Sequence, residues 1–77
     1  MITLTKAFYT KKEAAFIALK KYSTVQTYAI RKGLLKAING KVLIPAENML
    51  IIIKMYRPFD DAIISIPTAQ NKPNEVY

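Results

Sequence analysis

The chain has 77 residues, a net charge of +7 at pH 7, and neither cysteine nor histidine. A disulfide framework and a Cys/His metal site are therefore excluded, and the residues that most often serve as general base and thiol nucleophile in enzymes are missing. The length suits one small domain, the positive charge favours a polyanionic partner, and we expect a non-enzymatic protein without metal or cofactor.

The positive charge is concentrated in the first three quarters of the chain. Residues 1–57 hold eleven lysines and arginines against two acidic residues, and residues 58–77 hold one lysine against three acidic residues. The two segments therefore carry +9 and −2. We expect the surface that attracts a polyanion to lie on the folded part of the chain, residues 1–57, rather than on a basic terminal arm.

The first predicted elements are a strand and a helix. Residues 1–9 alternate loosely between apolar and polar side chains and indicate a short strand or an extended arm. Thr10 and Glu13 have the spacing of a capping box, in which each side chain bonds the backbone amide of the other residue. Apolar residues then recur at helical spacing, and the pattern predicts a helix over about residues 10–21.

A second helix with one polar face is predicted directly after the first. Ser23 and Thr24 are the candidate N-cap residues, and Gly33 is well placed to end the helix in the left-handed conformation. The residues spaced for a narrow buried face are Val25, Tyr28 and Ala29. The residues of the polar face are Ser23, Thr24, Gln26, Thr27 and Arg31. Two helices with almost no linker, the second with a donor-rich face, describe a helix-turn-helix that inserts its second helix into the major groove of DNA.

Asn39 and Gly40 mark a tight turn between two apolar arms, residues 34–38 and 41–45. This dipeptide tolerates the two positive φ values of a type I′ turn and so predicts a β-hairpin. Lys41 then lies beside the hairpin tip. A basic hairpin that follows a helix-turn-helix is the layout of a winged helix-turn-helix.

A third helix and a strand-like segment follow the hairpin. The helical pattern opens at Pro45 and runs to about Tyr56, and it is apolar nearly all round, which one small domain cannot bury alone. Residues 62–66 are an apolar run closed by Pro67. We expect either that this run folds back over the third helix or that the two segments form a contact between subunits. The residues predicted for that oligomeric contact are Ile51, Ile52, Met55, Ile63, Ile64 and Ile66.

Together these elements predict a mainly α fold with a small β-hairpin, namely a winged helix-turn-helix with an extended C-terminal tail. Residues 1–57 are expected to form the DNA-binding domain, and residues 58–77 an apolar strand-like segment and polar tail for oligomerisation or partner binding. No signal-peptide pattern is seen, and no apolar run, that of residues 49–53 included, is long enough to cross a membrane. We therefore expect a soluble cytoplasmic protein that is associated with the nucleoid.

Three blocks of sequence resemble the excisionase-type winged helix, a family related to the DNA-binding heads of MerR-type regulators. The blocks are residues 9–15 (YTKKEAA), residues 30–37 (IRKGLLKA) and residues 41–45 (KVLIP), and the resemblance covers residues 9–56. It implies a small DNA-binding protein of a mobile element, phage or plasmid, with its second helix in a major groove and its wing over the minor groove or the backbone. Such a protein acts as an excisionase (a recombination directionality factor) with an integrase, or it regulates transcription from a promoter.

Eight residues are predicted to contact duplex DNA. Gln26 and Thr27 are the candidates for reading base edges, because glutamine suits the bidentate pair with adenine. The basic residues at the helix end and along the hairpin are candidates for holding phosphates. The full set is Ser23, Thr24, Gln26, Thr27, Arg31, Lys32, Lys36 and Lys41. A homodimer or a cooperative row of copies on DNA is expected, since one short helix reads only a few base pairs.

Two alternative functions stay open. A protein-interaction adaptor would use the same fold through its apolar third helix and its tail. A general nucleic-acid-coating protein would bind single strands or RNA, but exposed aromatic residues beside basic ones, the usual platform for single strands, are not evident in the sequence.

Overall fold

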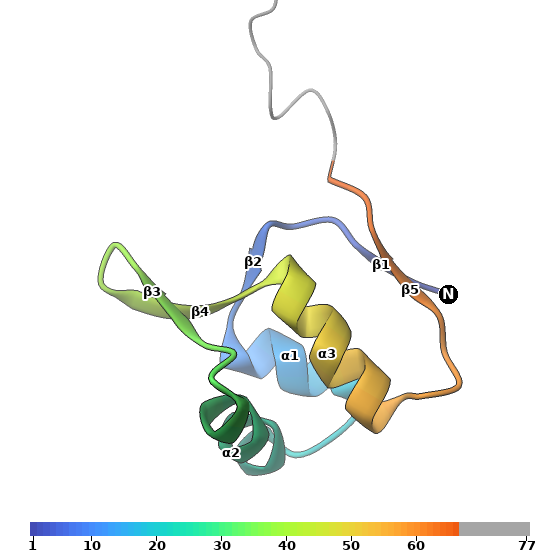
Figure 1. The fold of residues 1–77 in the computed structure, drawn as a ribbon, viewed down its shortest axis with the longest axis horizontal. Coiled ribbons are helices and arrows are strands. Elements are labelled where there is room, and N and C mark those ends of the chain that lie inside the picture. Colours follow the sequence, from blue (N-terminus) through green and yellow to red (C-terminus); the bar gives the residue numbers. More distant parts are fainter. Residues whose placement is uncertain (67–77) are drawn as a thin grey trace, which may run out of the picture.

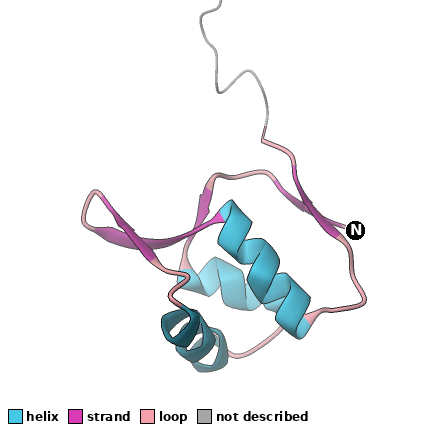
Figure 2. Cartoon of the chain, in the orientation of Figure 1, coloured by secondary structure: helices cyan, strands magenta, loops and turns pink. Residues whose placement is uncertain are grey.

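The computed structural model describes residues 1–66 of the chain (Figure 1). In this range the chain forms three helices, a three-stranded antiparallel sheet and a pair of parallel strands, so the fold is mixed α/β rather than mainly α (Figure 2). None of the helices in this part of the chain is long and apolar enough to cross a membrane. The expected polar tail, residues 68–77, lies outside the described residues.

The N-terminal arm leads through two short strands into the first helix, α1. The strands are β1 (Ile2–Leu4) and β2 (Phe8–Tyr9), and α1 covers Lys11–Ala18. The predicted capping box is confirmed. The Thr10 hydroxyl accepts a hydrogen bond from the Glu13 amide at 3.1 Å, and the Glu13 carboxylate accepts one from the Thr10 amide at 2.9 Å.

Helix α1 ends earlier than the predicted residue 21, because Leu19 turns the chain in the left-handed conformation (φ 60°, ψ 39°). The Lys20 amide donates to the Ala15 carbonyl at 3.1 Å, a bond typical of a left-handed helix stop. Glycine is the usual residue at such a stop, so a leucine gives no signal of it in the sequence. Only residues 19–21 then connect the two helices.

The second helix, α2, covers Tyr22–Lys32 and therefore begins before its predicted N-cap. Lys21 is the N-cap residue and makes no side-chain capping bond, so the predicted capping role of Ser23 and Thr24 is wrong. Because α1 stops early, α2 begins earlier in the sequence than predicted, and the hydroxyls of Ser23 and Thr24 lie within its first turn. Gly33 ends the helix in the left-handed conformation (φ 66°), as predicted.

The predicted hairpin is confirmed. Strands β3 (Lys36–Ile38) and β4 (Lys41–Pro45) pair antiparallel across a two-residue turn. Asn39 and Gly40 both have positive φ, 51° and 78°, as a type I′ turn requires. Strand β2 pairs with the other edge of β4, which gives the order β2-β4-β3, and the hairpin projects from the body of the molecule (Figure 1).

The third helix, α3, covers Ala46–Tyr56 and follows β4 without a loop, with Pro45 as its N-cap residue. Its predicted extent is confirmed. The chain then turns back, and β5 (Ala62–Ile64) pairs in parallel with β1 while also packing on α3. The Ile2 amide donates to the Asp61 carbonyl at 2.8 Å at the start of this pairing. The sequence gives no sign of this strand pair, because it joins distant parts of the chain.

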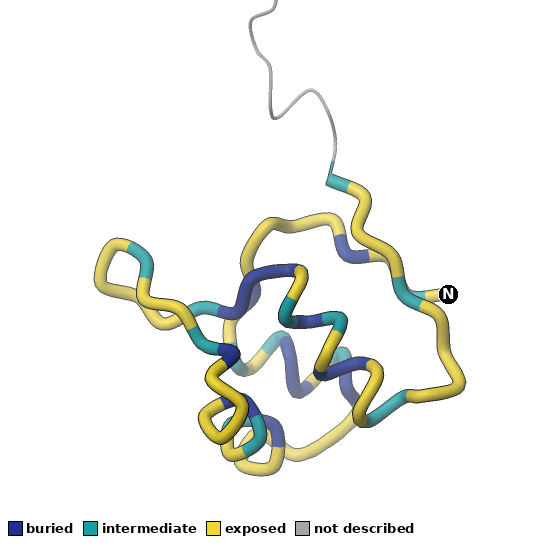
Figure 3. The backbone as a smooth tube through the Cα atoms, in the orientation of Figure 1, coloured by how far each residue is buried: buried dark blue, intermediate teal, exposed yellow. Residues whose placement is uncertain are grey.

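One core joins the helices and the sheets (Figure 3). The small side chains of α1 let both α2 and α3 pack against it. Arg57 ties the end of α3 to the end of α1, since its guanidinium donates to the Ile17 carbonyl at 2.9 Å and to the Asp60 carboxylate at 2.8 Å. The side chains with almost no exposed surface are Leu4, Ala14, Ala18, Val25, Ala29, Ile44, Met49, Ile52 and Ile53.

Candidate nucleic-acid interface

Helix α2 presents one side to the core and the opposite side to solvent. Val25 and Ala29 are fully buried, and at about 100° per residue the positions that point away from them are Ser23, Thr27 and Arg31. These three side chains, which we call the α2 face, are exposed. Within residues 1–66, no hydrogen bond or ion pair holds them. Their hydroxyl and guanidinium groups are therefore available to a ligand.

The two predicted base readers differ in exposure. Thr27 is exposed in the middle of the α2 face, whereas Gln26 is half-buried on its flank, one helical turn after Tyr22. Thr24 is exposed on the other flank, and Lys32 is exposed in the last turn of the helix. Of the two predicted base readers, Thr27 is the better placed to meet a ligand.

The two lysines predicted on the hairpin share one side of it. Lys36 lies opposite Leu43, and Lys41 lies opposite Ile38. Paired and alternate residues of a sheet point to the same side, so these four side chains lie together and Val42 points to the other side. Val42 borders α1 and α2. The structure therefore brings the two lysines together, but on the side of the hairpin that faces away from α2.

A groove of about 350 Å³ lies between the hairpin and the first turns of α1 and α2. We call it the wing-side groove, and its lining residues are Thr10, Lys11, Lys12, Tyr22 and Val42. Tyr22 is 42% exposed and Val42 is 47% exposed, so both apolar surfaces are open to a ligand. These residues come from three separate elements, and no local pattern in the sequence groups them.

A second groove, of about 410 Å³, lies along the other flank of α2, beside the end of α3. The rings of Tyr28 and Tyr56 meet there edge to face, with centroids 5.5 Å apart. The Lys20 ammonium lies 6.0 Å from the centre of the Tyr56 ring. Neither Lys20 nor Tyr56 is among the eight residues predicted to contact DNA. Lys20 directly precedes α2 in the sequence, whereas only the fold brings Tyr56 beside that helix. We call this hollow the tyrosine groove, and its lining residues are Ser23, Thr24, Thr27, Tyr28, Arg31 and Tyr56.

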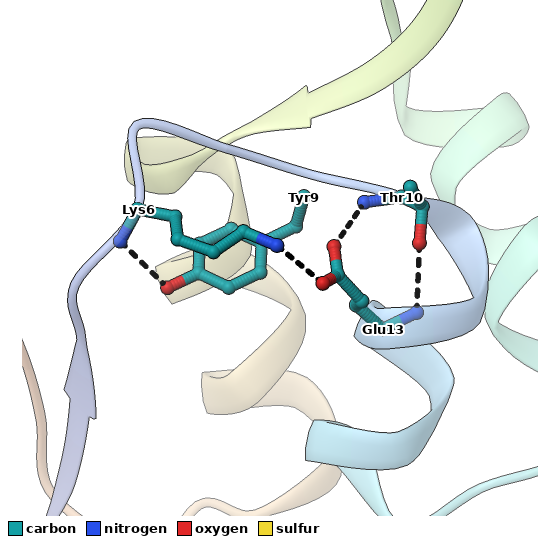
Figure 4. A network of polar contacts seen from close by, with 4 residues as sticks. All are labelled: Lys6, Tyr9, Thr10 and Glu13. Atoms are coloured by element: carbon teal, nitrogen blue, oxygen red, sulfur yellow. Dashed lines mark hydrogen bonds and ion pairs between the residues drawn. The ribbon is translucent and has the colours of Figure 1, made fainter.

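No carboxylate lies on α2 or on the hairpin. Between Glu13 and Glu47 the chain carries six lysines and arginines and no acidic residue. Glu13 itself is engaged by Lys6 in the network of Figure 4. The hydrogen bond from Lys6, followed by that from the Thr10 amide, holds the pKa of the Glu13 carboxylate below its ordinary value. Both flanks of the α2 face are therefore basic, which suits a polyanionic ligand.

The residues predicted for an oligomeric contact fall into two groups. Ile52 has no exposed surface and belongs to the core, so its predicted place in an intermolecular contact is wrong. Its position on α3 faces the same interior as Met49 and Ile53. The exposed members of the set are Ile51, Met55, Ile63 and Ile64, and Ile66 is half-buried.

The arrangement as a whole is a basic, hydroxyl-rich helix face with a groove on each flank. Within residues 1–66, no three side chains of His, Cys, Asp or Glu gather as they would around a metal ion. Comparison of the chain with protein-family models, with curated proteins and with solved structures found no match.

Proposed function

We propose that this protein binds duplex DNA with sequence preference, as a winged helix-turn-helix. Helices α1 and α2 would form the helix-turn-helix, with α2 in the major groove, and the β3–β4 hairpin would be the wing. The observation that carries the proposal is the α2 face, which offers exposed hydroxyl and guanidinium groups on a segment without carboxylates. The major groove of DNA admits a helix of this kind and displays a distinct pattern of donors and acceptors for each base pair.

The α2 face provides the groups that base reading needs. The hydroxyls of Ser23 and Thr27 can each donate and accept a hydrogen bond, and the Arg31 guanidinium at the end of the face would hold a phosphate beside them. Gln26 has the length to reach a base edge from its flank position. Thr24 and the other side chains at the margin of the face would contact the backbone.

The lysines provide the part of the binding energy that does not depend on sequence. Lys32 at the end of α2, with Lys36 and Lys41 on the wing, would bind phosphates. The wing-side groove adds Lys11 and Lys12 on the other side of the hairpin.

The assembled form on DNA is proposed to be a homodimer or a cooperative row of copies. One short helix reads few base pairs, and exposed apolar side chains, Ile51 and Met55 on α3 and Ile63 on β5, are available for contact between copies. From the resemblance described above, we propose a role as an excisionase or a transcription regulator of a mobile element, phage or plasmid, with an integrase or another recombination or transcription protein as partner.

A competition titration tests the proposal. The purified full chain is bound to a fluorescent duplex, and unlabelled duplex DNA, single-stranded DNA and RNA of the same sequence then compete. We expect duplex DNA to compete best. Equal competition by single strands and RNA would favour a general coating protein, and absence of duplex binding at low salt would remove the proposal.

One observation favours an adaptor as the second candidate. Phe16 is 82% exposed and Phe59 is 98% exposed, near the end of the molecule where Arg57 joins α3 to α1. Exposed aromatic side chains are typical of protein contacts. The double charge reversal Lys36→Glu with Lys41→Glu separates the two functions. If the double variant loses DNA binding but still restores the phenotype of a deletion strain, the adaptor function is the right one.

A further inference from the structure

We propose that the tyrosine groove holds the sugar–phosphate backbone of one DNA strand while the α2 face reads the bases beside it. The phosphate ligands would be the hydroxyls of Tyr28 and Tyr56 and the cations of Lys20 and Arg31. The inference rests on the proposed function. It adds the groups that fix one strand against α2, and two of them, Lys20 and Tyr56, lie outside that helix.

The groove has the extent and the position that a strand requires. It follows α2 from Ser23 to Arg31, which is about 12 Å at a rise of about 1.5 Å per residue. A strand of DNA carries one phosphate per about 3.4 Å of helix axis, so several phosphates fall within this length. The groove shares Ser23, Thr27 and Arg31 with the α2 face, so a strand seated in it lies next to the bases that the face would meet.

The residues that line the groove favour an anionic ligand. Five of its six residues carry a hydroxyl, the sixth is Arg31, and none is acidic. Within residues 1–66, no hydrogen bond engages the hydroxyl of Tyr28 or Tyr56, and neither Lys20 nor Arg31 takes part in an ion pair. Tyrosine, serine and threonine hydroxyls, with lysine and arginine, are the groups that contact phosphate and sugar oxygens in protein–DNA complexes.

A stacked base fits the groove less well than a phosphate does. Tyr28 and Tyr56 pack edge to face at an interplanar angle of 71°, and Lys20 lies over the Tyr56 ring. The aromatic rings are thus engaged with one another and with a cation. Proteins that bind single strands instead leave ring faces open for successive bases. What the groove offers to a ligand is therefore its hydroxyl groups and its positive charge.

Two substitutions remove single phosphate ligands. Tyr56→Phe keeps the ring and removes the hydroxyl, and it should weaken binding to duplex DNA of any sequence by about 3- to 10-fold, the loss of one hydrogen bond. Lys20→Gln should flatten the slope of log K against log salt by about 0.9. The matched control is Lys54→Gln on α3. Lys54 lines one hollow with Asp60 and Asp61 and another with Tyr28, but it is not among the residues that line the tyrosine groove, so affinity and slope should stay unchanged. Circular dichroism and thermal unfolding check that the variants fold.

Neutral methylphosphonate linkages, placed one at a time in each strand of the duplex, locate the contact. The effect of Lys20→Gln should disappear at one linkage on one strand, because the charge that Lys20 meets is already absent there. Wild-type affinity of both groove variants for duplex DNA, or additive effects at every linkage, would overturn the groove assignment and leave the proposed function standing. A loss confined to single-stranded DNA would overturn it in favour of stacking. A wild-type chain that binds no duplex DNA would remove the proposed function and the groove assignment together.

Discussion

Glu13 performs two tasks at the start of α1. Its carboxylate completes the capping box with Thr10, and it pairs with Lys6 on the arm between β1 and β2 (Figure 4). The Lys6 ammonium also lies 5.2 Å from the centre of the Tyr9 ring, and the Lys6 amide donates to the Tyr9 hydroxyl at 3.2 Å. The N-terminal arm is thereby tied to α1, the helix on which α2 packs.

The stability of the protein should depend on pH through Glu13. Its pKa is lowered in the folded state, first by the hydrogen bond from Lys6 and then by that from the Thr10 amide. A carboxyl group whose pKa is lowered by folding contributes its full stabilisation of the folded state above its unfolded pKa, about 4.3. That contribution is lost as the pH falls through the lower pKa of the folded state. Glu13→Gln keeps an amide oxygen for the capping box and removes the charge.

Urea unfolding of wild type and Glu13→Gln at a series of pH values measures this contribution. The difference in free energy of unfolding should be constant around neutral pH and should shrink below about pH 4. A difference that stays the same down to about pH 3 would show that the carboxylate charge contributes nothing to stability.

Helices α1 and α2 stop in the same backbone conformation but with different residues. Leu19 ends α1 at φ 60°, and Gly33 ends α2 at φ 66°. A Cβ atom makes this conformation costly. Leu19 is 68% exposed, so little packing offsets that cost. The first helix therefore ends at a strained position that no local sequence signal predicts.

The two helix stops give a matched pair of substitutions. Leu19→Gly should raise the free energy of unfolding by about 0.5 to 1 kcal/mol, since it relieves the left-handed leucine. Gly33→Ala should lower it by about 1 kcal/mol. A Cβ at Gly33 meets no atom within 4 Å, so that loss reports the backbone alone. Chemical denaturation measures both, and a destabilised Leu19→Gly would contradict the strain at this stop.

Elements with strong local signals were predictable from the sequence. The capping box, the turn at Asn39 and Gly40, and α3 all follow from neighbouring residues and are confirmed. The start of α2 was not predictable, because it depends on the stop at Leu19. The parallel pair of β1 and β5 was not predictable either, since strand pairing between distant segments is set by tertiary packing rather than by local pattern.

The candidate site likewise has features that the local sequence predicts and features that depend on the fold. Helical periodicity alone predicts the buried Val25 and Ala29 and the exposed Ser23, Thr24, Thr27 and Arg31. Tyr28, predicted on the buried face, and Gln26, predicted on the polar face, are both half-buried. Neither groove was predictable. Their linings combine α2 with the hairpin or with α3, and only tertiary packing brings those segments together.

At the scale of the whole molecule, charge dominates the expected binding behaviour. Residues 1–57 carry a net charge of +9. Each phosphate contact adds about 0.9 to the steepness with which affinity falls as salt rises. The affinity for duplex DNA should therefore fall steeply as the salt concentration rises. The wing lysines should contribute to this salt dependence equally for every DNA sequence.

Lys41→Ala isolates the contribution of the wing tip. The substitution should weaken binding to all duplex sequences alike and flatten the slope of log K against log salt by about 0.9. Lys54→Ala, on α3 beside Asp60 and Asp61, is the matched control and should leave the slope unchanged. Fluorescence anisotropy titrations at several salt concentrations measure both slopes. An unchanged slope for Lys41→Ala would exclude the wing tip from the interface.

Selection from a pool of duplexes with randomised sequence tests most directly whether α2 reads bases. The wild-type protein should enrich one short motif. Thr27→Ala should change the preference at adjacent positions of that motif, at a cost of about 0.5–1.5 kcal/mol on the preferred site for the loss of one hydrogen bond, and should bind random duplexes about as well as wild type. The absence of an enriched motif for wild type, or the same motif and ranking for Thr27→Ala, would contradict base reading by the α2 face.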